Sequence, residues 1–145
     1  MRLHRQLLIG ASLVAALGTA LAQDQTASPD VVRGVVDGLA YRNGGIGRDE
    51  ALAMVRREGD YTLRLGFSEG PHNAYLADVK LDIYDAKGRR IFALGEAGPL
   101  VDVQLPAGRY RVVAETGGVR REGTVAVEPN RLTELYLHWS KDPQS

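Results

Sequence analysis

The chain has 145 residues, of which 18 are basic, 18 are acidic and none is cysteine, so it is formally neutral at pH 7. A neutral chain lacks the clustered basic excess that is typical of nucleic-acid-binding proteins. The absence of cysteine excludes disulfides and thiol chemistry, and the length suits one hydrophobic core rather than two.

Residues 1–22 have the pattern of a secretory signal peptide. Arg2 and Arg5 give a basic start, the apolar run Leu7–Leu17 follows, and Ala20-Leu21-Ala22 supplies the small residues that a signal peptidase requires. The apolar run is shorter than the ~20 residues that span a bilayer, which disfavours a membrane anchor. We expect cleavage before Gln23 and a periplasmic or secreted protein that does not span the membrane.

Residues 23–43 are expected to be a flexible or extended N-terminal segment. Gln23–Pro29 is polar and has no periodicity, as in many flexible tails. The β-branched residues of Val31–Val36 favour a strand, while their recurrence at i and i+4 also suits a helix. Two glycines weaken both interpretations, so residues 31–41 stay open between strand, helix and coil, with a preference for an extended segment.

Residues 44–59 are expected to form a loop followed by one short helix. Three glycines within four positions predict the loop, and they are Gly44, Gly45 and Gly47. Acidic residues in the first turn and basic residues in the last predict a helix from about Arg48 to Glu58. A helix of barely three turns requires tertiary support, and we expect Leu52 and Val55 to dock it on a sheet.

From residue 60 to 140 the apolar residues recur with a period of two, which predicts half-buried strands. The expected strands are Tyr61–Phe67, Val79–Tyr84, Arg89–Leu94, Val101–Leu105, Tyr110–Ala114, one around Val125–Val127, and Leu135–Trp139. Glycine and proline turns separate them at intervals of about ten residues. This spacing predicts a mainly-β fold, a seven-stranded antiparallel Ig-like or prealbumin-like β-sandwich with one short N-terminal helix. Residues 141–145 are expected to fray.

One strand–turn–strand stretch organises this domain. Pro106 lacks an N–H group and is expected to close the incoming strand. Gly108 is expected to supply a positive φ at the reversal. Tyr110 is then expected to begin the buried face of the outgoing strand.

The stretch Val101–Val112 resembles the carboxypeptidase regulatory-like domain, a prealbumin-like sandwich, in which leucine, proline, glycine and tyrosine fall at this spacing. Val79–Gly88 is similar to the first hairpin of that domain. Tyr41–Glu50, with Asp60-Tyr61, is similar to the leader of small exported proteobacterial proteins of this type. The resemblance implies a sandwich fold and no catalysis, because in metallocarboxypeptidases this module is an appendage of the enzyme.

Residues suited to chemistry are scarce in this sequence. His72 and His138 lack the partners of a metal-binding motif, and we identify no catalytic residue, no metal site and no cofactor. The aromatic residues are better candidates for binding, and we nominate the loop cluster His72, Asn73 and Tyr75. We expect a non-catalytic periplasmic module that recognises an envelope protein or polymer. The alternative is a small-ligand carrier or sensor with the glycine loop and helix closing over a pocket, and a hydrolase is a weaker hypothesis.

Overall fold

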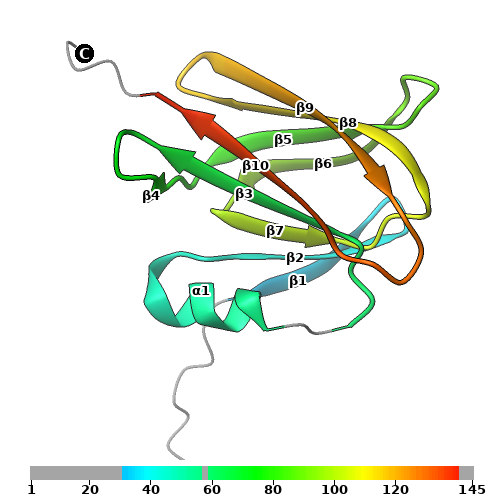
Figure 1. The fold of residues 1–145 in the computed structure, drawn as a ribbon, viewed down its shortest axis with the longest axis horizontal. Coiled ribbons are helices and arrows are strands. Elements are labelled where there is room, and N and C mark those ends of the chain that lie inside the picture. The colour runs from blue at the N-terminus through cyan, green and yellow to red at the C-terminus, as the bar shows by residue number, and fades with distance from the viewer. Residues whose placement is uncertain (1–30, 57–58, 141–145) are drawn as a thin grey trace, which may run out of the picture.

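The computed structural model describes residues 31–56 and 59–140. The expected signal peptide, the tail from Gln23 to residue 30 and the expected frayed residues 141–145 lie outside the described residues. Two β-sheets form a sandwich, and a single short helix lies outside one of them (Figure 1). The mainly-β sandwich with one short helix is therefore confirmed, but the described residues contain ten strands rather than seven.

The first sheet, sheet A, has six strands. Five of them follow the spatial order β1-β2-β7-β3-β10, and the two-residue β4 pairs with β3. Their bounds are β1 Val32–Val36, β2 Leu39–Gly44, β3 Leu63–Glu69, β4 Ala74–Tyr75, β7 Leu100–Val103 and β10 Thr133–Trp139. Neighbours are antiparallel except β3 and β10, which run parallel, so the expected all-antiparallel arrangement is wrong for this one pair.

The second sheet, sheet B, has four antiparallel strands in the order β6-β5-β8-β9. They span Val79–Tyr84 for β5, Arg90–Ala97 for β6, Gly108–Thr116 for β8 and Val119–Val127 for β9. The predicted turn of residues 85–88 joins β5 to β6, with Gly88 donating its N–H to the Asp85 carbonyl at 3.0 Å. Strand β6 continues through Gly95, where a break was expected, because register shifts in its pairing with β5 accommodate the irregular sequence.

The segment left open by sequence forms the hairpin β1–β2. Asp37 and Gly38 have φ values of 48° and 81°, as a two-residue turn between right-handedly twisted strands requires. The hairpin extends sheet A because β2 pairs with β7. Gly44 is accordingly the buried last residue of β2 rather than part of a loop, which corrects the expected boundary, whereas Gly45 and Gly47 have positive φ outside the strands.

The connection from β7 to β8 crosses from sheet A to sheet B, so it is not the hairpin that its sequence suggested. Gly108 is the first residue of β8, opposite Val127, and it does not have the expected positive φ. The turn is fixed instead by Tyr110, whose hydroxyl donates a 2.7 Å hydrogen bond to the Pro106 carbonyl. Such a tyrosine corner, bonding back to backbone a few residues upstream, is a known device of β-sandwiches.

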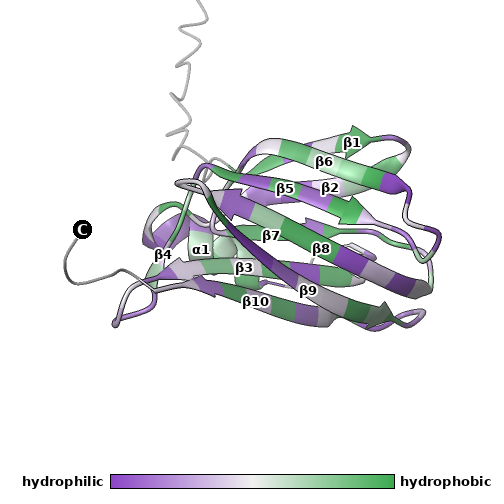
Figure 2. Ribbon diagram, turned by 90° about the horizontal axis from the view of Figure 1, so that it is seen from above, coloured by the Kyte–Doolittle hydropathy of each residue, from purple (hydrophilic) through white to green (hydrophobic). Residues whose placement is uncertain are grey.

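The core lies between the two sheets and contains the inward residues of both. Apolar and polar residues alternate along the strands in Figure 2, as the period of two predicted. Tyr110 is buried, and Trp139 packs edge-on against Phe67 while its indole N–H donates to the Val119 carbonyl at 2.9 Å. Tyr61, the first residue of a predicted strand, is only half-buried, and the guanidinium carbon of Arg42 lies 5.2 Å from its ring centroid.

Helix α1 spans Gly47–Val55, shorter than predicted, and it lies on the outer face of sheet A (Figure 1). Leu52 and Val55 are 53% and 59% exposed, so the predicted docking through these residues is wrong. Met54 is fully buried instead, with its side chain against Gly44. The helix does not dock through its apolar residues because the sheet face beneath it carries buried charged side chains. These side chains need backbone carbonyl oxygens as hydrogen-bond acceptors, which apolar side chains cannot supply.

Candidate functional site

Four charged side chains form a row across the outer face of sheet A. The strand register places Arg42 beside Asp102, Asp102 beside Arg64, and Arg64 beside Glu134. The Asp102 carboxylate binds Arg42 Nε at 2.7 Å and Arg64 Nε at 2.8 Å. Asp102, Arg42 and Arg64 are all buried, so this part of the row is an internal ion cluster.

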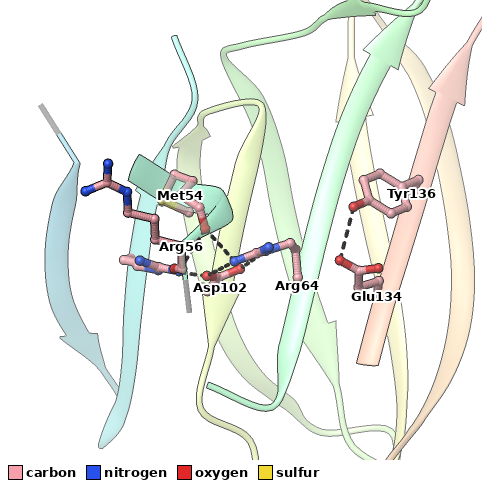
Figure 3. A network of polar contacts seen from close by, with 7 residues as sticks. Met54, Arg56, Arg64, Asp102, Glu134 and Tyr136 are labelled. Atoms are coloured by element: carbon pink, nitrogen blue, oxygen red, sulfur yellow. Dashed lines mark hydrogen bonds and ion pairs between the residues drawn. The ribbon is translucent and has the colours of Figure 1, made fainter. Parts of the chain in front are cut away.

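The C-terminal end of α1 covers this cluster (Figure 3). Arg42 donates to the carbonyl oxygens of Met54 and Arg56, each at 2.8 Å, and Arg64 also donates to the Met54 carbonyl. The last carbonyls of a helix have no partner within the helix and carry partial negative charge. The two guanidinium groups donate hydrogen bonds to these carbonyls and place positive charge beside them, and they thereby fix the helix to the sheet.

The buried cluster has no capacity left for a ligand. Every buried side-chain nitrogen and oxygen atom in the described residues has a hydrogen-bond partner. The hydrogen bond to Asp102 raises the pKa of Arg64 above its ordinary value, against the opposing effect of burial. The cluster is therefore a structural element that positions the helix, and a candidate site has to lie elsewhere.

Solvent-exposed ion pairs, which contribute little to stability, lie on the outer face of sheet B, one across strands β8 and β9 and one within β9. Glu122 accepts from Arg111 at 3.4 Å and from Arg120 at 2.6 Å, with all three side chains substantially exposed. Arg64 also lies on an outer strand face, in sheet A, but α1 removes it from solvent. The two sheets thus hold one buried and one exposed carboxylate, each between two arginines.

Beyond the row, toward the C-terminal ends of β3 and β10, the same face carries a patch of aromatic and polar side chains. We call it the tyrosine surface, and its members are Ser68, Tyr75, Tyr136 and His138. Its floor is Gly66, which is paired with Tyr136. A Cβ atom at position 66 would lie 2.3 Å from Tyr136 Cδ1, so only glycine lets the tyrosine ring lie on the sheet, where its side chain is 59% exposed.

Strand pairing brings the other members together around this ring. Ser68 lies opposite both His138 and Tyr75, and its Oγ is 2.9 Å from His138 Nδ1. Tyr75 is 58% exposed. The result is an exposed face with two phenol rings, a hydroxyl and an imidazole.

The tyrosine surface is linked to the charged row through Glu134. The Tyr136 hydroxyl donates to Glu134 Oε1 at 3.3 Å (Figure 3). Burial raises the pKa of Tyr136 above its ordinary value, and the neighbouring Glu134 carboxylate adds to the rise. Tyr136 is therefore a neutral hydrogen-bonding phenol at physiological pH, with its ring available to a ligand.

The predicted trio His72, Asn73 and Tyr75 lies in and beside one turn, and its role in binding stays a prediction. All three are exposed in or beside the β3–β4 turn, where Asn73 has a φ of 50°, and the described contacts do not join their side chains into one site. Tyr75 instead meets Ser68. Alternation along the strand puts Tyr136 and His138 on one face, but the sequence analysis missed Ser68 as their neighbour, since no local signal predicts the parallel pairing of β3 with β10.

Two cavities lie at the opposite end of β3, and neither is lined by the glycine loop or by α1. One, of about 620 Å³, lies beside the segment leading into β3, and the other, of about 520 Å³, lies beside the β5–β6 turn. The nominated residues Gly44, Gly45 and Gly47 line neither, whereas Pro106 lines both. The idea of a pocket closed by the glycine loop therefore gains no support from these cavities.

Within the described residues, no group of three histidine, cysteine, aspartate or glutamate side chains is placed to hold a metal ion. The helix of residues 47–55 is too short to cross a membrane, and the described part of the chain has no other candidate. No protein-family model and no curated protein matches this chain. The resemblance to the carboxypeptidase regulatory-like domain therefore stays a prediction.

Proposed function

We propose that this chain is a non-catalytic binding module that recognises a glycan polymer of the cell envelope through the tyrosine surface. The observation that carries the proposal is the Tyr136 ring, packed over Gly66 with more than half of its side chain exposed. Tyr75 is a second exposed aromatic residue on the same face, and exposed apolar surface that gathers on one face marks interaction sites. Tyrosine also suits amphipathic ligands, because its ring is apolar and its hydroxyl hydrogen-bonds.

The chemistry around Tyr136 favours a sugar over a protein partner. The apolar face of a pyranose ring can stack on a phenol ring, while its hydroxyls require hydrogen-bonding neighbours. Ser68, His138 and Glu134 supply donors and acceptors beside the ring. A protein interface instead has a contiguous apolar core surrounded by a polar rim, and here polar groups lie between the tyrosines.

The local charge favours an uncharged polymer. Glu134 is the exposed carboxylate of this surface, and Arg64 lies directly beside it in the strand register. Opposite charges at this separation largely cancel each other's field at the surface. A neutral glycan strand therefore meets no repulsion from this pair of charges. Arg121, which is exposed and donates to the His138 carbonyl at 3.1 Å, adds one positive charge at the edge of the surface.

We interpret the Ser68–His138 pair as a binding feature rather than a catalytic one. Serine hydrolases hold the histidine ring with a buried carboxylate and exclude water from the reacting atoms. Here both side chains lie on an open sheet face, and the bond uses His138 Nδ1. The expected export signal of residues 1–22 places such a module in the envelope, where glycan polymers are abundant.

The test is co-sedimentation of the purified mature chain with isolated peptidoglycan sacculi, in parallel with affinity electrophoresis in neutral soluble polysaccharides. We expect binding to a glycan, and at least tenfold weaker binding for Tyr136→Ala. The matched control is Tyr84→Ala, because Tyr84 lies on the outer face of sheet B beneath Arg111. Absence of binding to every glycan, or equal losses in both variants, would overturn the proposal.

A further inference from the structure

The β5–β6 turn lies between two neighbouring cavities at one end of the sandwich. The first, of about 520 Å³, is lined by this turn and by the β1–β2 turn, and we call it the apolar cavity. The second, of about 230 Å³, is lined by the β5–β6 turn and the start of β8, and we call it the basic cavity. Asp85, Arg89 and Tyr110 line both, so the two cavities adjoin. The volume of the apolar cavity is within the range of small-molecule binding sites.

The apolar cavity offers a ligand carbon-rich walls. Four residues supply aliphatic side chains or an aromatic ring, and they are Leu39, Ile91, Pro106 and Tyr110. Its charged residues of opposite sign are balanced, because Asp37 and Asp85 line it together with Arg89 and Arg90. Arg90 also has a carboxylate outside the cavity, since its Nη1 atom lies 3.5 Å from Asp82 Oδ1.

The basic cavity has an excess of positive charge. Of the described residues that line it, Lys87, Arg89 and Arg109 are cationic and Asp85 is the one carboxylate. Arg89 Nε lies 3.6 Å from Asp85 Oδ2, which is longer than a good charge-assisted hydrogen bond. Neither Lys87 nor Arg109 forms an ion pair with any described residue. Two positive charges of this cavity are therefore available to an anion.

Hydrogen bonds hold the walls of the basic cavity in place. Asp85 Oδ1 accepts from the backbone N–H groups of Lys87 and Arg89, each at 2.9 Å. The bond from the Arg89 N–H lowers the pKa of Asp85 below its ordinary value, so this carboxylate is ionised at neutral pH and continues to hold the turn. On the opposite wall, the Tyr110 hydroxyl donates to the Pro106 carbonyl. Walls that are already ordered lose little conformational entropy when a ligand binds.

We infer that the two cavities together bind a small amphipathic anion, with a carboxylate or phosphate head in the basic cavity and an apolar body in the apolar cavity. Lys87 and Arg109 donate charge-assisted hydrogen bonds to the head. The orientation follows from Asp37, which lines the apolar cavity alone and would repel the head there. The site shares no residue with the tyrosine surface, and the inference does not depend on the glycan-binding proposal.

The test is a titration of the ¹⁵N-labelled mature chain with octanoate and with octyl phosphate, followed by amide chemical shifts. The matched compounds are 1-octanol and octylamine, which have the same chain but no negative charge. We expect saturable shifts at residues 37–39, 85–91 and 107–110 with at least one of the two anions. Both matched compounds should bind at least about tenfold more weakly, which is the effect of losing one hydrogen bond to a charged group.

The double variant Lys87→Gln/Arg109→Gln should bind the anion at least about tenfold more weakly and lose its preference over 1-octanol. The control Lys80→Gln/Arg131→Gln removes the same two charges from exposed positions that line neither cavity, and it should keep both the affinity and the preference. The amide spectrum of each variant reports directly whether it is folded. No saturable shift with either anion, equal binding of the four compounds, or equal losses in the two double variants would overturn the inference.

Discussion

The buried cluster predicts that Asp102→Asn strongly destabilises the protein. The Asp102 carboxylate accepts three hydrogen bonds, from Arg42 Nε at 2.7 Å and from Arg64 Nε and Nη2 at 2.8 and 2.9 Å. Asparagine retains one oxygen acceptor but directs an amide donor at a guanidinium donor. The two buried arginines then lose the negative charge of the carboxylate that they share.

The size of the expected loss in the free energy of unfolding follows from the burial of the cluster. Removing one partner of a buried ion pair costs about 3–5 kcal/mol, because a charge is left uncompensated in the interior. Hydrogen bonds to charged groups contribute roughly 1.5–3 kcal/mol each and are not additive, which is consistent with that range. A loss of about 3–5 kcal/mol is a large fraction of the ~5–15 kcal/mol by which folded domains are stable.

The matched control is Glu122→Gln, because Glu122 also lies between two arginines but is exposed. Exposed pairs contribute about 0–1 kcal/mol, so this variant should unfold almost like the parent. The assay is urea unfolding, followed by the fluorescence of the single tryptophan, the buried Trp139, and by circular dichroism. Similar, small losses in both variants would refute the reasoning that the cluster stabilises the fold.

Three further predictions concern the helix, the tyrosine corner and alkaline pH. Met54→Ala should cost about 2–5 kcal/mol and Leu52→Ala less than about 1 kcal/mol in urea unfolding, and the reverse order would place the wrong helix face on the sheet. Tyr110→Phe should cost roughly 0.5–1.5 kcal/mol by removing the hydrogen bond to the Pro106 carbonyl, whereas an unchanged midpoint would mean that the corner does not stabilise the turn. Burial raises the pKa of Tyr110, so its contribution to stability should be complete below pH ~10 and be lost as the pH rises through the folded-state pKa. The urea midpoint of Tyr110→Phe should therefore fall less than that of the parent as the pH rises through this range. Equal declines in both proteins would contradict the conclusion that Tyr110 is the residue whose titration destabilises the fold.

The strands that build the core could be predicted from sequence because an alternating pattern is local. Leu63, Leu65 and Phe67 have a period of two whatever their partner strands are, and all three are buried. The β1–β2 hairpin was harder to predict, because Val31–Val36 fits the strand and the helix periods, and its sequence favoured the extended form only slightly. The segment is a strand because it pairs with Leu39–Gly44, and that strand in turn pairs with β7.

The buried charges could not be predicted from the same alternation. Arg42, Arg64 and Asp102 occupy the polar phase of their strands, which normally faces water. Their burial results from α1 lying over them, and the helix in turn is held by those arginines. Neither half of this arrangement is encoded in a local pattern, which is why the apolar residues of the helix indicated the wrong face.

The candidate site was predictable only in part, for the same reason. Tyr75 was nominated from its sequence position, and Tyr136 and His138 share a face by simple alternation. Their meeting with Ser68 depends on a parallel pairing that joins residues 70 positions apart. Gly66 looked like an ordinary outward strand residue, and its role as the floor beneath Tyr136 emerges only when the two strands are adjacent.

Glycan recognition by the tyrosine surface is tested most directly by photocrosslinking in living cells, with a photoreactive amino acid at position 136 and, separately, at position 84. Mass spectrometry of the tryptic peptide that contains each position then identifies what was captured. We expect sugar masses on the peptide with position 136 and none on the peptide with position 84. Capture of a peptide from another protein at position 136, or equal labelling at the two positions, would contradict the assignment of this face to a glycan.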